Sequence, residues 1–234
     1  MEAIVIKELE AAIKVAYSGK QLGNTHQRYG NNGKANFDSF LARFPDKKVY
    51  NMPAVGGASI IEVDDKPPAR VYAGEYDALV TKNPAALLTL RAADCIPLVF
   101  FSPGEQILAL AHVGTSGAAS HLPRQVVKFL KIDPANLHVY FGPAIAKGSY
   151  KFPRQDFDKQ LNASWDSYIA SDDHFVYLDL IGYVTNELKA AGVKSQNITV
   201  EKVDTGANPN YFSHRRHKLV GEPDGRNAFA VCLV

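Results

Sequence analysis

Two apolar runs on either side of a turn constrain the fold of this chain most strongly. Residues 96–101 and 107–112 are rich in branched and aromatic side chains, and Ser102-Pro103-Gly104-Glu105 between them is a turn signal. This pattern predicts a β-hairpin. Cys95 directly precedes the first run and His112 ends the second. The predicted hairpin therefore returns a cysteine and a histidine to the same end of the sheet.

The register of this hairpin decides how Cys95 and His112 meet. A two-residue loop at Pro103-Gly104 places the two residues directly opposite each other. A loop at Gly104-Glu105 places His112 opposite Pro97 and leaves Cys95 as a diagonal neighbour on the same face, whereas a three-residue loop turns the two side chains to opposite faces. A Cys–His pair at such a place is either a nucleophile with its base or two ligands of a soft metal.

Length and charge exclude several classes of protein. The chain has 234 residues, 46% of them hydrophobic, with 26 basic and 24 acidic side chains. We expect one domain over residues 1–234, with a small-molecule partner and no nucleic acid, because no basic stripe is present. No apolar run approaches the roughly 18 residues of a membrane span, and no signal-peptide pattern opens the chain. Two widely spaced cysteines form no disulfide framework, so we expect a cytoplasmic protein with reduced thiols.

Strand patterns dominate the rest of the chain and intermix with a few helical ones. Strands are predicted at residues 13–17, 48–52, 59–63, 78–81, 86–90, 96–101, 107–112, 137–141, 176–178, 198–203 and 228–234, and helices at 121–130, 155–165 and 180–191. Asp179 is the predicted N-cap of the last helix, and Gly192 its C-terminal glycine. No regular strand–helix–strand repeat appears, which indicates an α+β fold with mixed or antiparallel sheets. Cys232, in the last strand, is expected to be buried and inert.

An ordered series of short motifs resembles the YfiH family, which is also called the laccase-domain or multicopper polyphenol oxidase family. The motifs are Asp-Ala-Leu-Val-Thr at 77–81, Ala-Asp-Cys-Ile-Pro at 93–97, Ala-His-Val-Gly at 111–114, Phe-Gly-Pro-Ala-Ile at 141–145 with Tyr150 after it, Asp179-Leu180 with Gly192-Val193 after the helix, Phe-Ser-His-Arg-Arg at 212–216, and Gly225-Arg226. The resemblance covers residues 48–234, and the first 45 residues fit loosely.

The resemblance implies mixed β-sheets packed as a sandwich and flanked by helices, a fold shared with a class of bacterial toxin deamidases. It implies a zinc or copper site made by two histidines and one cysteine. It also implies purine nucleoside chemistry: phosphorolysis of adenosine, inosine and methylthioadenosine, and deamination of adenosine. Cys95 and His112 fall on two of the three ligand positions.

The chain is a divergent member by this comparison. Gly56 stands where the family's Q-V-H-G motif has its histidine, and Thr115-Ser116 replaces the Trp-Arg of H-A-G-W-R-G. A cysteine and a tyrosine of the family are replaced by Asp204 and His214. With only two ligands kept, we expect zinc, or copper, to bind weakly or not at all, unless His214 or Asp204 supplies the third ligand.

The strongest cationic cluster is the segment that begins at His214. His214, Arg215 and Arg216, joined by Arg226, are candidates for binding an anionic part of the substrate, and a solvated loop is the alternative. Loss of the family's arginine at Ser116 removes an anion clamp, which weakens the case for phosphate as a co-substrate. His26 has no partner in the sequence and is interpreted as structural.

Three functional hypotheses follow. The first is an enzyme that acts on purine nucleosides with Cys95 and His112 at its centre. The second is a metal-free cysteine hydrolase or deamidase in which His112 activates the Cys95 thiol. The third is a non-catalytic descendant that keeps the fold and binds a ligand or a partner, which the missing histidine, tryptophan and arginine favour.

Overall fold

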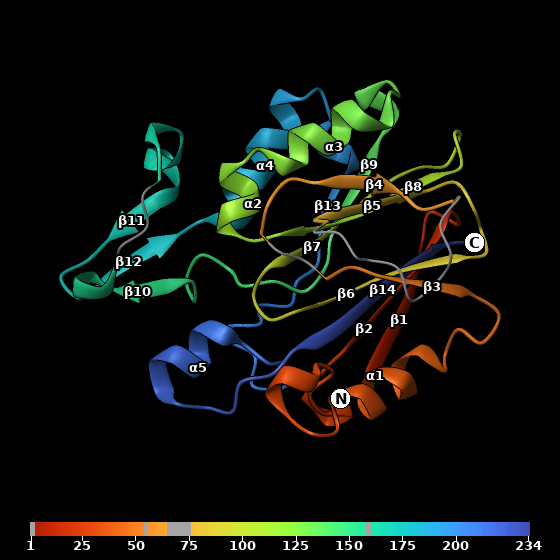
Figure 1. The fold of residues 1–234 in the computed structure, drawn as a ribbon. Coiled ribbons are helices and arrows are strands. Elements are labelled where there is room, and N and C mark those ends of the chain that lie inside the picture. Colours follow the sequence, from red (N-terminus) through yellow and green to blue (C-terminus); the bar gives the residue numbers. More distant parts are fainter. Residues whose placement is uncertain (1–2, 54–55, 65–75, 158–160) are drawn as a thin grey trace.

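Two large sheets packed face to face form the centre of the molecule (Figure 1). The computed structural model describes residues 3–53, 56–64, 76–157 and 161–234. The strands are β1 (Ile4–Leu9), β2 (Ile13–Ser18), β3 (Lys48–Asn51), β4 (Ile60–Glu62), β5 (Ala78–Thr81), β6 (Ala86–Ala92), β7 (Ile96–Ser102), β8 (Ile107–Val113), β9 (His138–Phe141), β10 (Lys151–Pro153), β11 (Ile169–Ser171), β12 (Phe175–Leu178), β13 (Ile198–Val200) and β14 (Asn227–Leu233). Each predicted strand corresponds to one of these.

Each large sheet mixes parallel and antiparallel pairs. One has the order β13-β9-β7-β8-β5-β4, the other the order β1-β2-β14-β6-β3. The β13–β9, β4–β5 and β3–β6 pairs are parallel and the other pairs in these two sheets are antiparallel. The predicted α+β class with a sandwich of mixed sheets is therefore confirmed.

The inner faces of the two sheets share one core. Val15, Leu88 and Val231 of the five-stranded sheet pack in the same buried cluster as Val99 and Leu110 of the six-stranded sheet. The alternate residues of β7 face the other way and pack in the cluster that holds the helices. Because both faces of this strand are buried, its sequence is a continuous apolar run rather than an alternating one.

Helices cover the outer faces of the sandwich. α2 (Thr115–Ala119), α3 (Leu122–Leu130) and α4 (Leu180–Ala190) lie over the six-stranded sheet, α1 (Gly33–Leu41) lies over the five-stranded sheet, and α5 (His214–Val220) lies at one end. Short 3-10 helices are η1 (Lys20–Leu22), η2 (Gln27–Tyr29), η3 (Pro134–Asn136), η4 (Arg154–Asp156), η5 (Ala163–Tyr168) and η6 (Ser195–Asn197). Among the described residues, no helix has the length and apolar character needed to cross a membrane.

The caps predicted for α4 are present. The Asp179 side chain accepts a hydrogen bond from the Gly182 amide at 2.8 Å, and Gly192 has a φ of +96°.

The helix predicted at 155–165 is wrong where the structure describes it: η4 and η5 occupy its two ends, and residues 158–160 lie outside the described part. Asn162 accepts a hydrogen bond from the Ser164 amide and so starts a new turn at that point.

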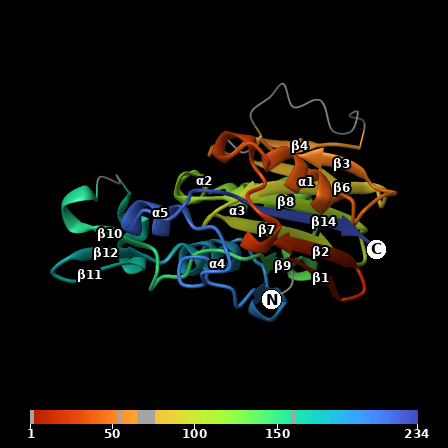
Figure 2. The same ribbon diagram turned by 90° about the horizontal axis from the view of Figure 1, so that it is seen from below.

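A third, three-stranded sheet of order β10-β12-β11 lies beside the sandwich (Figures 1 and 2). The sequence patterns did not predict β1, β10, β11, α1 or α2. Residues 214–218 were interpreted as a loop or an anion site, whereas they form the first part of α5. Ser213 caps α5, because its hydroxyl accepts a hydrogen bond from the Arg216 amide at 3.1 Å.

Candidate active site

The site lies where the chain crosses from one large sheet to the other. β6 belongs to the five-stranded sheet and β7 to the six-stranded sheet, so residues 93–95 span the gap. Asp94 has a φ of +83°, a left-handed conformation that aspartate tolerates better than most residues. Its carboxylate accepts hydrogen bonds from the Thr205 hydroxyl at 2.8 Å and the Arg215 amide at 2.6 Å. Asp94 therefore holds the crossing against the start of α5.

The β7–β8 hairpin has the register in which His112 lies opposite Pro97, one of the two registers expected to keep Cys95 and His112 on the same face. Ser102 pairs with Ile107 and Pro97 with His112, so the loop spans residues 103–106. Cys95 is half-buried just before β7. A Cβ atom on Gly114 would lie 2.9 Å from its sulfur, so only glycine leaves room for the thiol there. Cys95 and His112 line the same cavity, of about 320 Å³.

The environment of His112 keeps its ring neutral. Burial, together with the charge of Arg226, lowers the pKa of His112 to about 4, although the nearby Asp77 acts in the opposite direction. Within the described part of the chain, Nδ1 of His112 is buried without a hydrogen-bond partner. Asp77 itself is buried and accepts hydrogen bonds from the amides of Gly56 at 2.8 Å and Gly57 at 2.9 Å. At neutral pH the site therefore holds an uncharged imidazole.

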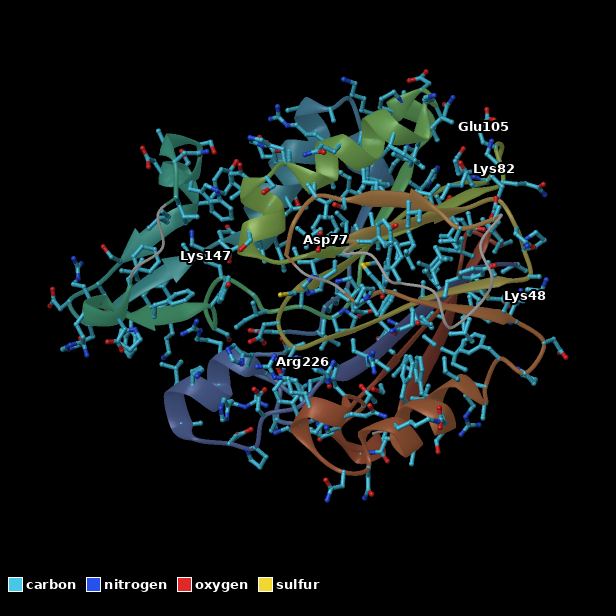
Figure 3. The ribbon with its side chains drawn as sticks, viewed as in Figure 1. Lys48, Asp77, Lys82, Glu105, Lys147 and Arg226 are labelled. Atoms are coloured by element: carbon cyan, nitrogen blue, oxygen red, sulfur yellow. The ribbon has the colours of Figure 1, made fainter. Side chains whose placement is uncertain are left out.

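Arginines and histidines from segments far apart in the sequence line the same cavity. The lining residues come from η2 and its N-cap, the two residues after β3, the end of β6 and the crossing, β8, the start of α5 and the residue before β14. They are His26, Arg28, Tyr29, Met52, Pro53, Arg91, Ala92, Ala93, Cys95, His112, His214 and Arg226. Burial and the positive charges of Arg91, Arg226 and Arg28 lower the pKa of His26. The three guanidinium groups thus gather around one imidazole. In Figure 3, Arg226 and Asp77 lie at the end of the sandwich opposite to Lys48, Lys82 and Glu105.

Two of the four predicted anion-binding residues reach the cavity and two do not. His214 and Arg226 line it. Arg216 instead donates hydrogen bonds to the carbonyl groups of Thr205, at 2.8 Å, and Tyr211, at 2.6 Å, and so holds the preceding loop. The guanidinium of Arg215 lies 3.7 Å from the centre of the Phe152 ring. Arg215 and Arg216 therefore do not line this cavity, and their predicted part in anion binding stays a prediction.

The sequence patterns did not identify His26, Arg28, Tyr29 or Arg91 as residues that line the cavity, and His26 was interpreted as structural. The sequence holds one signal that could have found Arg91, which is the only charged residue in the otherwise apolar strand β6. The segment 26–29 carries no comparable signal, because its position depends on how η2 packs against the sandwich.

The hydroxyl groups of Thr115 and Tyr150 lie close to Cys95. They form a hydrogen bond of 2.8 Å, and burial together with the neighbouring Cys95 raises the pKa of Tyr150 to about 12. Thr115 stands where the family resemblance places a tryptophan. Tyr150 therefore keeps its proton at neutral pH and remains a hydrogen-bond donor beside the thiol.

The described residues do not fit a three-ligand metal site. Among them, no group of three or more His, Cys, Asp and Glu side chains is arranged to hold a metal ion. Asp204 is engaged elsewhere, since it accepts hydrogen bonds from the Ser149 hydroxyl at 2.6 Å and the Ala146 amide at 3.1 Å. His214 lies in the cavity with its Nδ1 3.3 Å from the Asp224 carboxylate, but it forms no three-ligand group with Cys95 and His112 among the described residues. Neither residue replaces the ligand that is lost at Gly56.

Known proteins similar to this chain agree with the resemblance found in the sequence. A purine nucleoside phosphorylase of Rickettsia conorii is 27% identical over 206 residues, which cover 85% of this chain and 83% of that protein. A purine nucleoside phosphorylase of Mycobacterium tuberculosis is 29% identical over 192 residues, 81% of this chain and 74% of that protein.

Solved structures show the same fold. The YfiH protein of Bacillus licheniformis superposes with a TM-score of 0.81 at 21% identity, over 95% of this chain and 93% of that one. A Neisseria meningitidis protein gives a TM-score of 0.81 at 18% identity and covers 99% of both chains. The family model for "multi-copper polyphenol oxidoreductase laccase" matches residues 7–234. The chain therefore belongs to this family, the YfiH family that its motifs resemble.

Proposed function

We propose that this chain catalyses the phosphorolysis of purine nucleosides in the cavity lined by Cys95 and His112. In this reaction the bond between C1′ of the ribose and the purine nitrogen breaks, and a bond from C1′ to a phosphate oxygen forms. The phosphate proton passes to the purine nitrogen, so the products are a free purine and ribose 1-phosphate. The supporting observation is one cavity of about 320 Å³ that joins the Cys–His pair to a cationic wall, in a chain whose relatives are named purine nucleoside phosphorylases.

Each part of the cavity has a task in this proposal. His112 is the proposed proton-transfer group, because its buried Nδ1 has no hydrogen-bond partner among the described residues and its ring is neutral, burial having lowered its pKa to about 4. The half-buried Cys95 thiol sits beside it on the cavity wall. The cavity volume is at the lower end of the roughly 300–1,000 Å³ range of small-molecule sites, which suits one nucleoside. Adenosine, inosine and methylthioadenosine are the proposed substrates.

A metal-free cysteine hydrolase or deamidase is the second candidate. The observation that favours it is that Cys95 and His112 belong to no group of three or more metal-ligating side chains among the described residues. The low pKa of His112 works against it, because a thiolate–imidazolium pair needs a histidine that holds its proton near neutral pH. This candidate predicts rapid labelling of Cys95 by iodoacetamide near pH 7 and hydrolysis without phosphate.

The test is release of the free purine from adenosine, inosine or methylthioadenosine by the purified full chain, with and without phosphate. We expect release that depends on phosphate. Cys95→Ala and His112→Ala are each expected to lower turnover by about a hundredfold or more, because proton-transfer groups typically contribute at least that factor. Cys232→Ala is the matched control, since Cys232 is the other thiol and is buried in β14 beneath α1.

Three outcomes contradict the proposal. Absence of turnover with all three nucleosides would favour a protein that only binds ligands. Turnover that is independent of phosphate would favour the hydrolase or an adenosine deaminase, in which water replaces the amino group and ammonia leaves. Full activity of Cys95→Ala and His112→Ala would move the reaction to another part of the molecule.

A further inference from the structure

The cationic wall of the cavity, formed by Arg28, Arg91 and Arg226, carries positive charge that the described residues neutralise only in part. Arg226 pairs with Asp224 at 2.7 Å, and the same carboxylate is also 3.3 Å from His214. Arg28 and Arg91 form no ion pair with any residue that the structure describes. Among the residues that the structure describes, only Arg226 of these three arginines has an ion-pair partner.

Arg91 is held in place although its charge is uncompensated. Its guanidinium lies 4.8 Å from the centre of the Phe37 ring and donates a long hydrogen bond of 3.5 Å to the Thr25 carbonyl. Burial lowers the pKa of Arg91, which shows that its charged form is poorly solvated. A half-buried cation of this kind costs free energy unless an anion accompanies it. A ligand with negative charge would remove this cost on binding.

The donors on this wall are already oriented. Arg226 donates to the Tyr29 hydroxyl at 2.6 Å, and its guanidinium stacks over the same ring at 4.0 Å. Nδ1 of His26 accepts a hydrogen bond from the Arg28 amide at 3.2 Å. The neutral ring therefore carries its proton on Nε2, which is left for a ligand. Guanidinium forks and an imidazole N–H match the oxygens of a tetrahedral dianion.

Resting on the proposed function, we propose that Arg28, Arg91 and Arg226, together with His26, form a phosphate-binding subsite of the cavity. Ser116, which replaces the arginine of the family motif, is exposed and is not part of the cavity lining. Loss of that arginine therefore does not remove phosphate recognition from this chain, because arginines of other segments supply the charge. The ligand is a phosphate group, either inorganic phosphate or the 5′-phosphate of a nucleotide.

Calorimetric titration of the full chain with inorganic phosphate tests the subsite directly. We expect binding to one site that weakens as salt is added. Arg28→Gln and Arg91→Gln should each weaken phosphate binding about tenfold or more, as expected for losing a hydrogen-bonded charge. Arg43→Gln is the matched control, because Arg43 is an exposed arginine outside the cavity.

Arg91→Lys is a second variant at this half-buried position, in case Arg91→Gln destabilises the fold. Lysine keeps the charge but not the planar fork, so phosphate binding should fall between wild type and Arg91→Gln. Arg28 is exposed, so Arg28→Gln should leave the thermal unfolding midpoint unchanged. Wild-type phosphate affinity in both Arg28→Gln and Arg91→Gln would overturn the subsite, and so would the absence of phosphate binding by the wild type.

Adenosine and adenosine 5′-monophosphate identify the source of the phosphate. If the nucleotide binds more tightly than adenosine and Arg91→Gln removes that advantage, the group belongs to the substrate. If inorganic phosphate and adenosine bind at the same time, the ligand of the subsite is inorganic phosphate.

The titration also separates this inference from the proposed function. Arginine-dependent phosphate binding without turnover would support the subsite and overturn phosphorolysis. Turnover with an unchanged phosphate KM in Arg28→Gln and Arg91→Gln would support phosphorolysis and overturn the subsite.

Discussion

At the scale of single residues, Gly114 controls the position of the Cys95 sulfur. An alanine Cβ at this position would lie 2.9 Å from the sulfur, while its φ of −94° suits any residue. Gly114→Ala is therefore expected to displace the thiol without straining the backbone, and to lower turnover about tenfold or more. Overpacking should cost about 1–3 kcal/mol of stability. Steady-state kinetics and thermal unfolding measure the two effects.

Gly104→Ala is the control for that substitution. Gly104 lies in the β7–β8 turn, and its added Cβ would meet no atom within 4 Å. It should keep wild-type turnover. If Gly114→Ala were as active as Gly104→Ala, the sulfur of Cys95 would not need its observed position, and its proposed part in the reaction would be wrong.

The sequence predicts some of the site at this scale and not the rest, for a physical reason. Cys95 directly precedes β7 and His112 lies in the adjacent strand β8, so a local pattern and a turn length are enough to bring them together. His26 and Arg28 lie between β2 and α1, far in sequence from Cys95 and His112, and reach the cavity through tertiary packing. A local pattern holds no information about such a contact.

At the scale of elements, strands were predicted more accurately than helices. The buried strands of the sandwich are continuous apolar runs, and each such run is a strong signal. The segment 155–165 also has helical spacing of apolar residues, but Trp165 uses its ring to stack on Tyr183 at 3.8 Å. A tertiary contact thus decides the structure of that segment. α5 was missed because its charged sequence has no apolar face.

The hairpin register shows what turn chemistry adds to pattern. Two registers kept Cys95 and His112 on one face, and the observed one has Pro97 opposite His112. Pro-Gly at the centre of a two-residue loop does not suit the primed turns that such hairpins prefer. The longer loop over residues 103–106 avoids this conflict, and it leaves the pair as diagonal neighbours rather than direct partners.

At the scale of the whole molecule, Glu201 links the two large sheets. Its carboxylate accepts hydrogen bonds from Lys7 of β1 at 2.5 Å and from the Tyr140 hydroxyl of β9 at 2.7 Å. Burial raises the pKa of Glu201, but these hydrogen bonds outweigh it and leave the pKa below the ordinary value of 4.5. A lowered pKa means stability that is present above pH 4.5 and is lost as the pH falls through the folded-state value.

Glu201→Gln tests this link through the pH dependence of unfolding. At pH 7 the variant should be about 1 kcal/mol less stable than wild type, because the charge-assisted hydrogen bonds are weakened. The difference should shrink as the pH falls below 4.5, where the wild-type carboxylate also becomes neutral. Urea unfolding at several pH values measures it, with the exposed Glu105→Gln as control. A difference that stays constant with pH would show that the charge of Glu201 does not stabilise the sandwich.

Phosphorolysis of a purine nucleoside in the cavity lined by Cys95 and His112 is tested most directly by phosphorus NMR of the full chain with inosine and phosphate, because this measurement follows the phosphate itself. We expect a ribose 1-phosphate signal that grows in equal amount with free hypoxanthine and is absent with Cys95→Ala. Hypoxanthine without a sugar phosphate, or an unchanged phosphate signal with inosine intact, would contradict it.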